Sequence, residues 1–496
     1  MSPTTPFKYV SEITGSGKTN NLLNKIARST QNYILAFPTI DLCDEISNYL
    51  GQRKVIDNVV VIHCDNFENP LHKFFNSVCQ DKNTRIIITT HATISRCMSV
   101  KITPEMKDWN LVIDEDMQFF NVHDFSLTDR TTPIIDSIVS VDEYDDTFYE
   151  VVIKDMTLAQ KVLDGTSNDS LMDHTKVLEL INYLLSDQYT TLIPKRIYEK
   201  YLEHTRDDDG NGLGKPKFKK FYCLSLVNHN FLNGFREITV LSSFYEKTIN
   251  YLMLQWLGVP MERIKLGTSK PHHGNSELVT INYYTRINWT RTFKKKEINH
   301  PLGKITVEDL ILERVLRELR NKEFIYSSNK DLRRKETFGS GKLVTSIRGV
   351  NSYSNYTNML FMQSLNAGST EVALLRFFGI SRSQIDFSRT VLGAYQFISR
   401  GAIRKTNNNK EISIHVMDKR TCDFLLGVFP NATTVYHEMD ITFVKEEMKD
   451  EEGKREPISA KDRTFVSRTK KKIREGKPIR EATMNKYNKI LKEYYE

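Results

Sequence analysis

The sequence predicts an α/β protein built on two parallel β-sheets, with an insertion in the first domain and a basic, helical C-terminal region. Two series of short, β-branched runs alternate with helical stretches, the first over residues 7–117 and the second over residues 270–440. Alternation of this kind is typical of parallel sheets covered by helices. Residues 445–496 are highly charged and form the predicted C-terminal region.

Composition excludes several classes of protein. The chain has 496 residues, of which 27% are charged and 39% hydrophobic, as in ordinary soluble proteins, and this length favours about three domains. No apolar run approaches the roughly 18–20 residues of a membrane span, and Met1–Lys8 lacks the apolar core of a signal peptide. The six cysteines form no Cys-x-x-Cys pair, which fits a reducing compartment. We expect a cytoplasmic protein with no membrane partner.

The first α/β domain is expected to comprise residues 1–117 and 236–268. Its buried strands are predicted where short apolar runs are bounded by polar turns. These strands lie at Phe7–Val10, Tyr33–Phe37, Val59–His63, Ile86–Thr90, Leu111–Ile113 and Ile238–Ser242, and helices are predicted at Asn20–Ser29 and Leu42–Leu50.

Residues 118–235 form the predicted insertion, because the composition changes there. Twelve acidic residues face three basic residues between positions 118 and 173, and one strand is predicted at Phe221–Val227. The second α/β domain is expected at residues 269–444. Its predicted strands are Leu278–Tyr284, Phe324–Ser328, Leu343–Ser346, Met359–Ser364 and Ile412–Met417, and a charged amphipathic helix is predicted at Val307–Arg320.

A glycine-rich loop follows the first predicted strand. It consists of Thr14, Gly15, Ser16, Gly17, Lys18 and Thr19, and it stands between a strand and a helix, where a phosphate-binding loop belongs. Its backbone N–H groups would cradle phosphates, Lys18 would reach the β- and γ-phosphates, and Thr19 would bind Mg²⁺. We therefore expect ATP and Mg²⁺ as ligands, although Glu12 replaces the small residue usual at the start of this pattern.

An apolar strand about one hundred residues later ends in two adjacent acids, Asp114 and Glu115. Asp114 would hold Mg²⁺, and Glu115 would orient and deprotonate an attacking water molecule. Asp116 is the weaker candidate for the base, because the alternation of side chains along a strand turns it away. An exposed acidic strand end is the alternative reading, and the phosphate loop upstream favours the catalytic one.

The phosphate loop and the acidic pair together resemble those of superfamily 2 helicases, which are built on two RecA-like domains. Further segments resemble the motifs of this family in the expected order. Pro38, Thr39, Thr90 and His91 stand where the family contacts the nucleic-acid backbone, Leu241–Phe244 stands at the place of motif III, and Phe324–Ser328 stands at that of motif IV.

The last two motifs of the resemblance lie in the second predicted domain. Thr345, Gly349 and Asn351 fit motif V, which implies a nucleic-acid contact for Thr345 and a nucleotide contact for Gly349 and Asn351. Gln396, Arg400 and Arg404 fit motif VI and would act catalytically, one arginine as the finger and the other as a sensor. The two arginines are four residues apart and would share a face if the segment were helical.

Three departures from the family pattern mark a divergent member, and a viral or phage origin is one reading of them. Met117 replaces the last polar residue of the acidic motif, motif III lacks its alanine and closing threonine, and Ser399 replaces a glycine in motif VI. DNA, single-stranded or forked, is favoured over RNA because no Asp-Glu-Ala-Asp box is present. Replication proteins are the expected protein partners.

Three segments are candidates for further nucleic-acid contacts. Aromatic and basic residues alternate over Tyr283–Lys296, including Arg286 and Trp289, although aromatic residues in a strand are more often core. Lys215 and Lys217 lie in the basic segment Lys215–Lys220, which is either the tip of a basic hairpin or a solvated loop. Residues 461–496 carry twelve basic and five acidic residues, including Lys471 and Lys472, which suits either a polyanion or a solvated helix.

The function most consistent with these patterns is an ATP-dependent nucleic-acid helicase or translocase, acting on DNA in replication or recombination. One alternative is a viral DNA-packaging motor ATPase with a C-terminal nuclease, which would have no second set of RecA-like motifs. The other is an origin-recognition or nucleic-acid-binding protein with a degenerate ATPase that does not unwind. The intact residues Lys18, Thr19, Asp114 and Glu115 favour the helicase over the degenerate ATPase.

Overall fold

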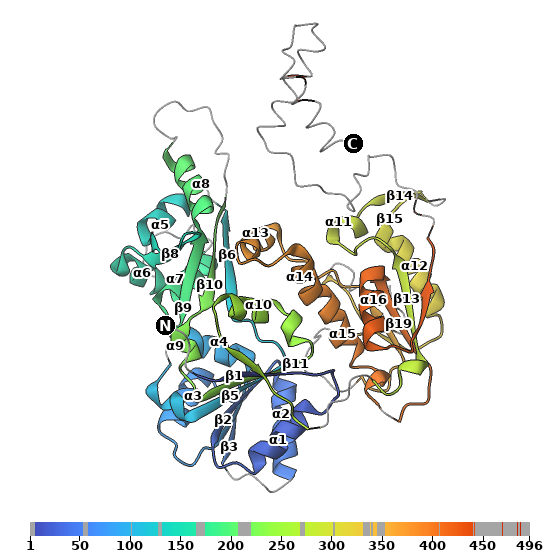
Figure 1. The fold of residues 1–496 in the computed structure, drawn as a ribbon, viewed down its shortest axis with the longest axis horizontal. Coiled ribbons are helices and arrows are strands. Elements are labelled where there is room, and N and C mark those ends of the chain that lie inside the picture. The colour runs from blue at the N-terminus through green and yellow to red at the C-terminus, as the bar shows by residue number, and fades with distance from the viewer. Residues whose placement is uncertain are drawn as a thin grey trace. The chain divides into compact units, whose positions relative to one another are not determined.

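The structure is a computed structural model. It describes residues 5–52, 58–100, 102–126, 131–164, 174–206, 220–267, 273–300, 303–330, 341–344, 353–405 and 407–439, with the single residues 338, 441, 469, 484 and 487. The chain divides into two compact units, one of residues 1–296 and 305–440 and the other of residues 297–304 and 441–496. The first unit contains both parallel sheets and the insertion (Figure 1).

The first domain is a parallel sheet of seven strands. In spatial order the strands are β12 (Met261–Arg263), β1 (Phe7–Ser11), β11 (Glu237–Ser242), β5 (Trp109–Asp114), β2 (Asn32–Phe37), β4 (Ile86–Thr90) and β3 (Val59–Ile62). The accompanying helices are α1 (Lys18–Ala27), α2 (Ile40–Gln52), α3 (Pro70–Cys79), α4 (His91–Val100) and α10 (Ile249–Trp256). Ser11 of β1 pairs with Ser242 of β11, and Leu241 of β11 pairs with Asp114 of β5. The carboxyl ends of β1, β11 and β5 therefore lie at the same edge of the sheet.

The second domain is a parallel sheet of six strands. Their order is β17 (Gly341–Leu343), β16 (Phe324–Ser327), β18 (Asn358–Phe361), β19 (Ile412–Asp418), β13 (Val279–Thr285) and β20 (Thr433–Tyr436). Its helices are α11 (Arg291–Lys294), α12 (Val307–Glu318), α15 (Leu392–Ile398) and α16 (Lys419–Val428). The predicted α/β class with two parallel sheets is confirmed, and most predicted strands end within one or two residues of the observed ones; β17 and β18 each end three residues earlier than expected.

The insertion contains an antiparallel sheet of five strands, of which only the last in sequence was predicted. Their order is β6 (Phe120–Ser126), β10 (Lys220–Val227), β9 (Tyr189–Pro194), β8 (Phe148–Ile153) and β7 (Val139–Glu143). The accompanying helices are α5 (Thr131–Ile138), α6 (Met156–Leu163), α7 (His174–Leu185) and α8 (Lys195–Arg206), with α9 (His229–Leu232) after β10. In β7 and β8 acidic and half-buried residues stand beside the apolar ones, which hides the pattern of a buried strand.

One segment of the second domain does not pack on its own sheet. Helices α13 (Ser369–Phe377) and α14 (Arg382–Asp386) bury Leu374, Leu375 and Ile385 in the core of the first domain and the insertion. The following helix α15 returns to the core of the second domain. The small strands β14 (Glu297–His300) and β15 (Gly303–Thr306) pair with each other. Among the described residues, no helix has both the length and the apolar character needed to cross a membrane.

Candidate nucleotide site and adjoining cavity

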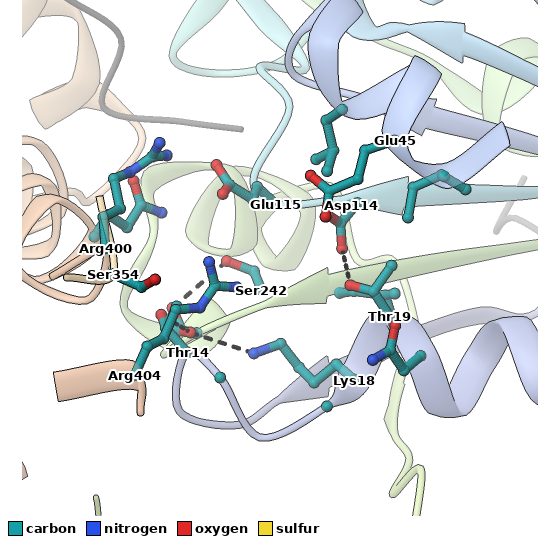
Figure 2. A pocket seen from close by; sticks show the side chains of 18 of the residues that line it. Thr14, Lys18, Thr19, Glu45, Asp114, Glu115, Ser242, Ser354, Arg400 and Arg404 are labelled. Carbon is teal, nitrogen blue, oxygen red and sulfur yellow. Dashed lines mark hydrogen bonds between the residues drawn. The ribbon is translucent and has the colours of Figure 1, made fainter. Parts of the chain in front are cut away.

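A cavity of about 460 Å³ lies where the carboxyl ends of β1, β5 and β11 face residues of the second domain. The first domain contributes the phosphate loop, Asp114, Glu115, Ser242 and Ser243, and the second contributes Ser354, Gln396, Arg400, Arg404 and Lys405. Figure 2 shows these side chains converging from both domains. The parallel topology places the site here, because loops at the carboxyl edge of a parallel sheet meet at one place.

The phosphate loop adopts the turn that its glycines permit. Gly15 and Gly17 have φ angles of 80° and 86°, in the left-handed region that glycine tolerates best. A Cβ atom on Gly15 would also lie 3.3 Å from Cγ of Arg404. Helix α1 begins at Lys18, so its first N–H groups are directed at the loop, as phosphate binding requires.

Lys18 is held inside the loop by protein acceptors. Its Nζ donates to the carbonyl oxygens of Glu12 and Ile13, each at 2.9 Å, and lies 3.4 Å from Oγ of Ser243. Burial lowers the pKa of Lys18, and the nearby carboxylates of Asp114, Glu12 and Glu115 oppose this effect. A phosphate group would supply the lysine with a stronger, charged acceptor.

Asp114 and Thr19 form the pair expected for a divalent cation. The Thr19 hydroxyl donates to Oδ1 of Asp114 at 2.9 Å, and Asp114 is only 9% exposed. Burial, followed by the neighbouring Glu115, raises the pKa of Asp114, whereas the Thr19 hydrogen bond lowers it. Oxygen ligands of this type suit Mg²⁺, whose charge would relieve the cost of burying the carboxylate. The two residues therefore fit the predicted ion.

Glu115 enters the cavity through an unusual backbone conformation. Its φ angle is 65°, and its N–H donates to the Leu241 carbonyl at 2.7 Å. In Figure 2 its carboxylate points into the cavity toward the side of Arg400. Asp116, by contrast, accepts a hydrogen bond from Asn250 at 2.7 Å, and Met117 is buried at 2% exposure. Of the three acids in this segment, Asp114 and Glu115 line the cavity and Asp116 does not.

Gln396, Arg400 and Arg404 all line the cavity, but they do not lie on one helix. Helix α15 ends at Ile398, and Arg404 lies in a separate 3₁₀ turn, Ala402–Arg404. The backbone changes course at Gly401, where a Cβ atom would lie 2.1 Å from Sδ of Met359. The two arginines reach the cavity by this change of course, and because the segment is not one helix, the condition for a shared helical face is not met.

Two contacts at the phosphate loop were missed by sequence reasoning, one between the domains and one within the first domain. Tyr395, fully buried, accepts the Thr14 N–H through its hydroxyl at 2.9 Å and lies 3.1 Å from Nε2 of His273. Ser243 places its hydroxyl 3.0 Å from that of Thr14. In the sequence, the only sign that Tyr395 belongs to the site was its position directly before Gln396. A tyrosine in an apolar helix cannot be distinguished by sequence from a residue that only packs in the core. Ser243 lay in the weakened motif III.

The nucleic-acid candidates of the first domain differ in accessibility. Pro38 and Thr39 are half-buried after β2. Thr90 is 8% exposed, and its hydroxyl lies 3.1 Å from that of Thr93, so it is satisfied inside the protein. The His91 ring bonds the Asp114 carbonyl at 2.9 Å, which holds the end of β5 in place. His91 therefore supports the metal side of the site in this structure.

Trp289 is not a stacking surface. It is 2% exposed, and its Nε1 donates to the Met362 carbonyl at 3.0 Å. The aromatic and basic residues of Tyr283–Lys296 were predicted to contact nucleic acid. For Trp289 this prediction was wrong, because its ring is buried in the protein core. Arg286 lies 5.0 Å over the Tyr436 ring. The predicted Lys215, Lys217, Thr345, Gly349, Asn351, Lys471 and Lys472 lie outside the described residues.

A second cavity, of about 450 Å³, adjoins the first. Ser243 and Gln396 line both cavities, so they form part of the wall between them. Five amide side chains line the second cavity, together with two arginines and one acid: Gln118, Asn250, Asn329, Asn366 and Gln396, with Arg291, Arg389 and Asp116. Such a lining offers many donors and acceptors to a polar ligand. No group of three or more His, Cys, Asp or Glu in the described part of the chain is placed to hold a metal ion.

Comparison with known proteins gives matches among solved structures alone. No protein-family model and no curated protein matches this sequence. S. tokodaii Xpd4 is 14% identical at a TM-score of 0.40, over 87% of this chain and 96% of that one. The DUF1998 helicase MrfA, bound to DNA, is 13% identical at a TM-score of 0.32, over 88% of this chain and 48% of that one.

A third solved structure is the DEAD-box helicase Mss116, bound to single-stranded RNA. It is 11% identical at a TM-score of 0.35, over 96% of this chain and 80% of that one. The likeness to all three is distant, so the inference of function depends on this chain's own residues. Those residues form two parallel-sheet domains that meet at a phosphate loop, which is the architecture that the resemblance to superfamily 2 helicases implied.

Proposed function

We propose that this protein is an ATP-dependent motor that moves along or unwinds nucleic acid. One observation carries the proposal: a single cavity joins the phosphate loop and the acids Asp114 and Glu115 of one domain to Arg400 and Arg404 of the other. A site divided in this way is complete only when the two domains are together. Hydrolysis in it is therefore tied to the relative movement of the domains.

The residues of the first domain bind the nucleotide and activate water. Lys18 leaves its carbonyl partners for the β- and γ-phosphates of ATP, and the N-terminus of α1 supports their charge. Thr19 and Asp114 would hold Mg²⁺, which supplies charge neutralisation at the phosphate oxygens. Glu115 accepts the proton of the attacking water, since its carboxylate is on the cavity side of the strand end.

The second domain supplies positive charge. Arg400 and Arg404 face the place where the γ-phosphoryl group would lie, and they stabilise the negative charge that spreads over its oxygens during transfer. Arg404 already covers Gly15. Gln396 stands in the wall between the two cavities, where it can contact both the nucleotide and whatever occupies the second cavity.

The second cavity is the proposed place of a nucleic-acid strand. Its amides and hydroxyls suit the sugar and base edges, and Arg291 and Arg389 suit phosphates. Ser243 borders this cavity and also lies near Thr14 and Lys18. A nucleic-acid strand bound in the cavity would therefore be separated from the phosphate loop by the Ser243 side chain. DNA is the preferred substrate in this proposal, since the sequence lacks an Asp-Glu-Ala-Asp box, and replication or recombination is the process it would serve.

The alternative of a packaging motor has less support. That function calls for a C-terminal nuclease in place of a second motor domain. Here β13 and β16 to β20 form a parallel sheet, and Arg400 and Arg404 of the same domain line the nucleotide cavity. A degenerate ATPase is the other alternative. That alternative agrees with the burial of Met117. It does not explain why Asp114 and Glu115 line the nucleotide cavity.

The test is the rate of ATP hydrolysis by the full chain, alone and with single-stranded DNA, single-stranded RNA or duplex DNA. We expect a single strand to raise the rate and DNA to raise it more than RNA. The variant Lys18→Ala should lose turnover because the phosphates lose their cation. Turnover in Lys18→Ala equal to that of the parent would refute the nucleotide site, and a rate that no nucleic acid changes would refute the motor.

A further inference from the structure

A buried ion pair joins α11 to α12 in the second domain. Nζ of Lys294 lies 2.7 Å from Oε1 of Glu308, and the two side chains are 0% and 8% exposed. Lys294 is the one lysine of the described residues that is buried. Two charges that leave water lose their hydration, and the attraction between them seldom exceeds this cost. Stability alone therefore gives little reason for the pair, so its further contacts are informative.

Lys294 also contacts the lining of the second cavity. Its Nζ donates to Oδ1 of Asn329, two residues after the end of β16, at 3.3 Å. The same Oδ1 accepts the Ser364 N–H at 2.9 Å, and the Asn329 amide donates to the Ser364 carbonyl at 3.2 Å. Asn329 and Ser364 both line the second cavity, and they follow the adjacent strands β16 and β18. The buried lysine thus helps to fix one wall of this cavity.

The same lysine anchors the short helix that carries Arg291. Helix α11 has four residues, from Arg291 to Lys294, and a single helical turn is not stable by itself. Directly before it, the Trp289 N–H donates to Oδ2 of Asp418 at 2.8 Å. Arg291 lies between these two anchors, is exposed and lines the second cavity. The place from which its guanidinium enters the cavity therefore depends on the contacts of Trp289 and Lys294.

We propose that the Lys294–Glu308 pair positions Arg291 and Asn329 against a phosphate of the bound strand. This proposal rests on the proposed function, in which the strand occupies the second cavity. Neither member of the pair lines that cavity, so both act through their neighbours and are positioning residues. Arg291 supplies the positive charge, and an arginine on an anchored helix loses less freedom on binding than one on a mobile segment.

The test removes the pair and leaves the net charge of the protein unchanged. Lys294→Met and Glu308→Leu are introduced together, so that no unpaired charge stays buried. Binding of a single-stranded DNA oligonucleotide to the full chain is measured by fluorescence anisotropy at several salt concentrations, and ATP hydrolysis is measured without a strand. The control is Lys8→Met with Glu237→Leu, an ion pair between β1 and β11 that lines neither cavity.

We expect the variant without the pair to unfold thermally at the temperature of the parent or above it, and to hydrolyse ATP without a strand at the parent's rate. Its Kd for the oligonucleotide should rise about tenfold, because a charged contact is lost. The slope of log affinity against log salt should flatten by about 0.7, the value for one phosphate contact with a single strand. The control should change neither quantity, although it also loses one lysine and one glutamate.

Arg291→Gln tests whether the pair acts through Arg291. In the parent it should raise the Kd and flatten the slope as much as loss of the pair does. In the variant without the pair it should add little, because residues that act as a unit have non-additive effects. A second tenfold rise in Kd there would overturn the proposal, and so would an Arg291→Gln protein that binds as the parent does.

A Kd and a slope that stay unchanged when the pair is removed would also overturn the proposal. If Lys294→Met with Glu308→Leu does not fold, Lys294→Met with Glu308→Gln takes its place, since the amide keeps the length of the Glu308 side chain. Failure of both variants to fold would make the pair a structural one and would overturn its positioning role. A parent protein that binds no strand would instead refute the proposed function.

Discussion

Glu115 in the nucleotide cavity and Phe244, next to the cavity residue Ser243, have backbone angles that residues other than glycine rarely adopt. Glu115 has a φ of 65° and Phe244 a φ of 54°. Such angles cost on the order of 1 kcal/mol or more and persist where the surroundings impose them. Here Glu115 turns its carboxylate into the cavity, and Phe244 turns its ring to within 5.3 Å of Tyr395 in the second domain.

Glu115→Gln should bind ATP and fail to turn it over. The amide keeps the shape of the side chain but cannot accept the proton of the attacking water, and loss of a general base costs about 10²–10⁴-fold in rate. Nucleotide binding can be followed by equilibrium titration and turnover by phosphate release. Asp116→Asn serves as the comparison, since Asp116 bonds Asn250 and does not line the nucleotide cavity, and its rate without nucleic acid should stay near that of the parent. If Glu115→Gln keeps turnover and Asp116→Asn loses it, Asp116 is the base.

Mg²⁺ binding should depend on pH through Asp114. Burial and the neighbouring Glu115 raise the pKa of Asp114 to about 7, whereas an unfolded aspartate titrates near 3.9. The folded protein holds this proton more tightly than the unfolded chain, so the contribution of Asp114 to the free energy of unfolding falls as pH rises from about 4 to about 7. Mg²⁺ displaces the proton, and its affinity should therefore rise about tenfold per pH unit in that window.

Calorimetric titration of Mg²⁺ in the presence of a non-hydrolysable ATP analogue would measure this dependence, with Asp114→Asn as the control that lacks the titrating group. An affinity that stays constant between about pH 5 and pH 7 would mean that Asp114 is already ionised in the folded protein.

At the scale of elements, the parallel strands could be predicted from the sequence because they are buried on both faces. β4 is buried along its whole length, and its predicted bounds were those observed. Four of the five strands of the insertion were not predicted. In β7 and β8 acids stand at exposed or half-buried positions, and the partner of β6 is the distant β10. A local sequence pattern indicates whether a residue is buried. It does not indicate which strand will pair with the strand that contains this residue.

Tyr395 in α15 is the element-scale link between the domains, and Tyr395→Phe should weaken it. The change removes the acceptor of the Thr14 N–H and keeps the ring against Phe244. An unsatisfied buried N–H costs about 1 kcal/mol, so strand-stimulated turnover should fall roughly fivefold while the KM for ATP changes little. Steady-state kinetics would separate the two parameters.

The matched control for this change is Tyr33→Phe, whose hydroxyl bonds Ser29 within the first domain at 3.1 Å. Equal effects of the two substitutions on stimulated turnover would mean that the Tyr395 hydroxyl has no part in joining the domains.

At the scale of the whole molecule, the net charge of +8 lies almost entirely in the last 36 residues. Residues 461–496 carry twelve basic and five acidic residues, a difference of +7. Truncation before Lys461 should weaken nucleic-acid binding and leave ATP binding intact, because every residue that lines the nucleotide cavity precedes position 461. Each lost phosphate contact should flatten the slope of log affinity against log salt by about 0.7–0.9.

Fluorescence anisotropy at several salt concentrations would measure that slope for the full and the truncated chain. An unchanged slope would assign the phosphate contacts to the body of the protein, where Arg291 and Arg389 in the second cavity are the first residues to test.

The sequence by itself determined the two parallel sheets, the phosphate loop and the residues Lys18, Thr19, Asp114 and Glu115. Each depends on a local pattern: a buried strand, a turn that needs glycine, or an acid at a strand end. A local pattern is visible in the chain because neighbouring residues create it.

Only the tertiary structure decided the contacts that join distant segments. It assigned Trp289 to the core, separated Arg400 from Arg404 at Gly401, set the Tyr395 hydroxyl on the phosphate loop and buried residues of α13 and α14 in the core shared by the first domain and the insertion. Trp289, Tyr395 and Phe378 are all aromatic, and which of them packs in the core, forms a hydrogen bond or joins two domains depends on neighbours more than 70 residues away. That information arises only when the domains fold together.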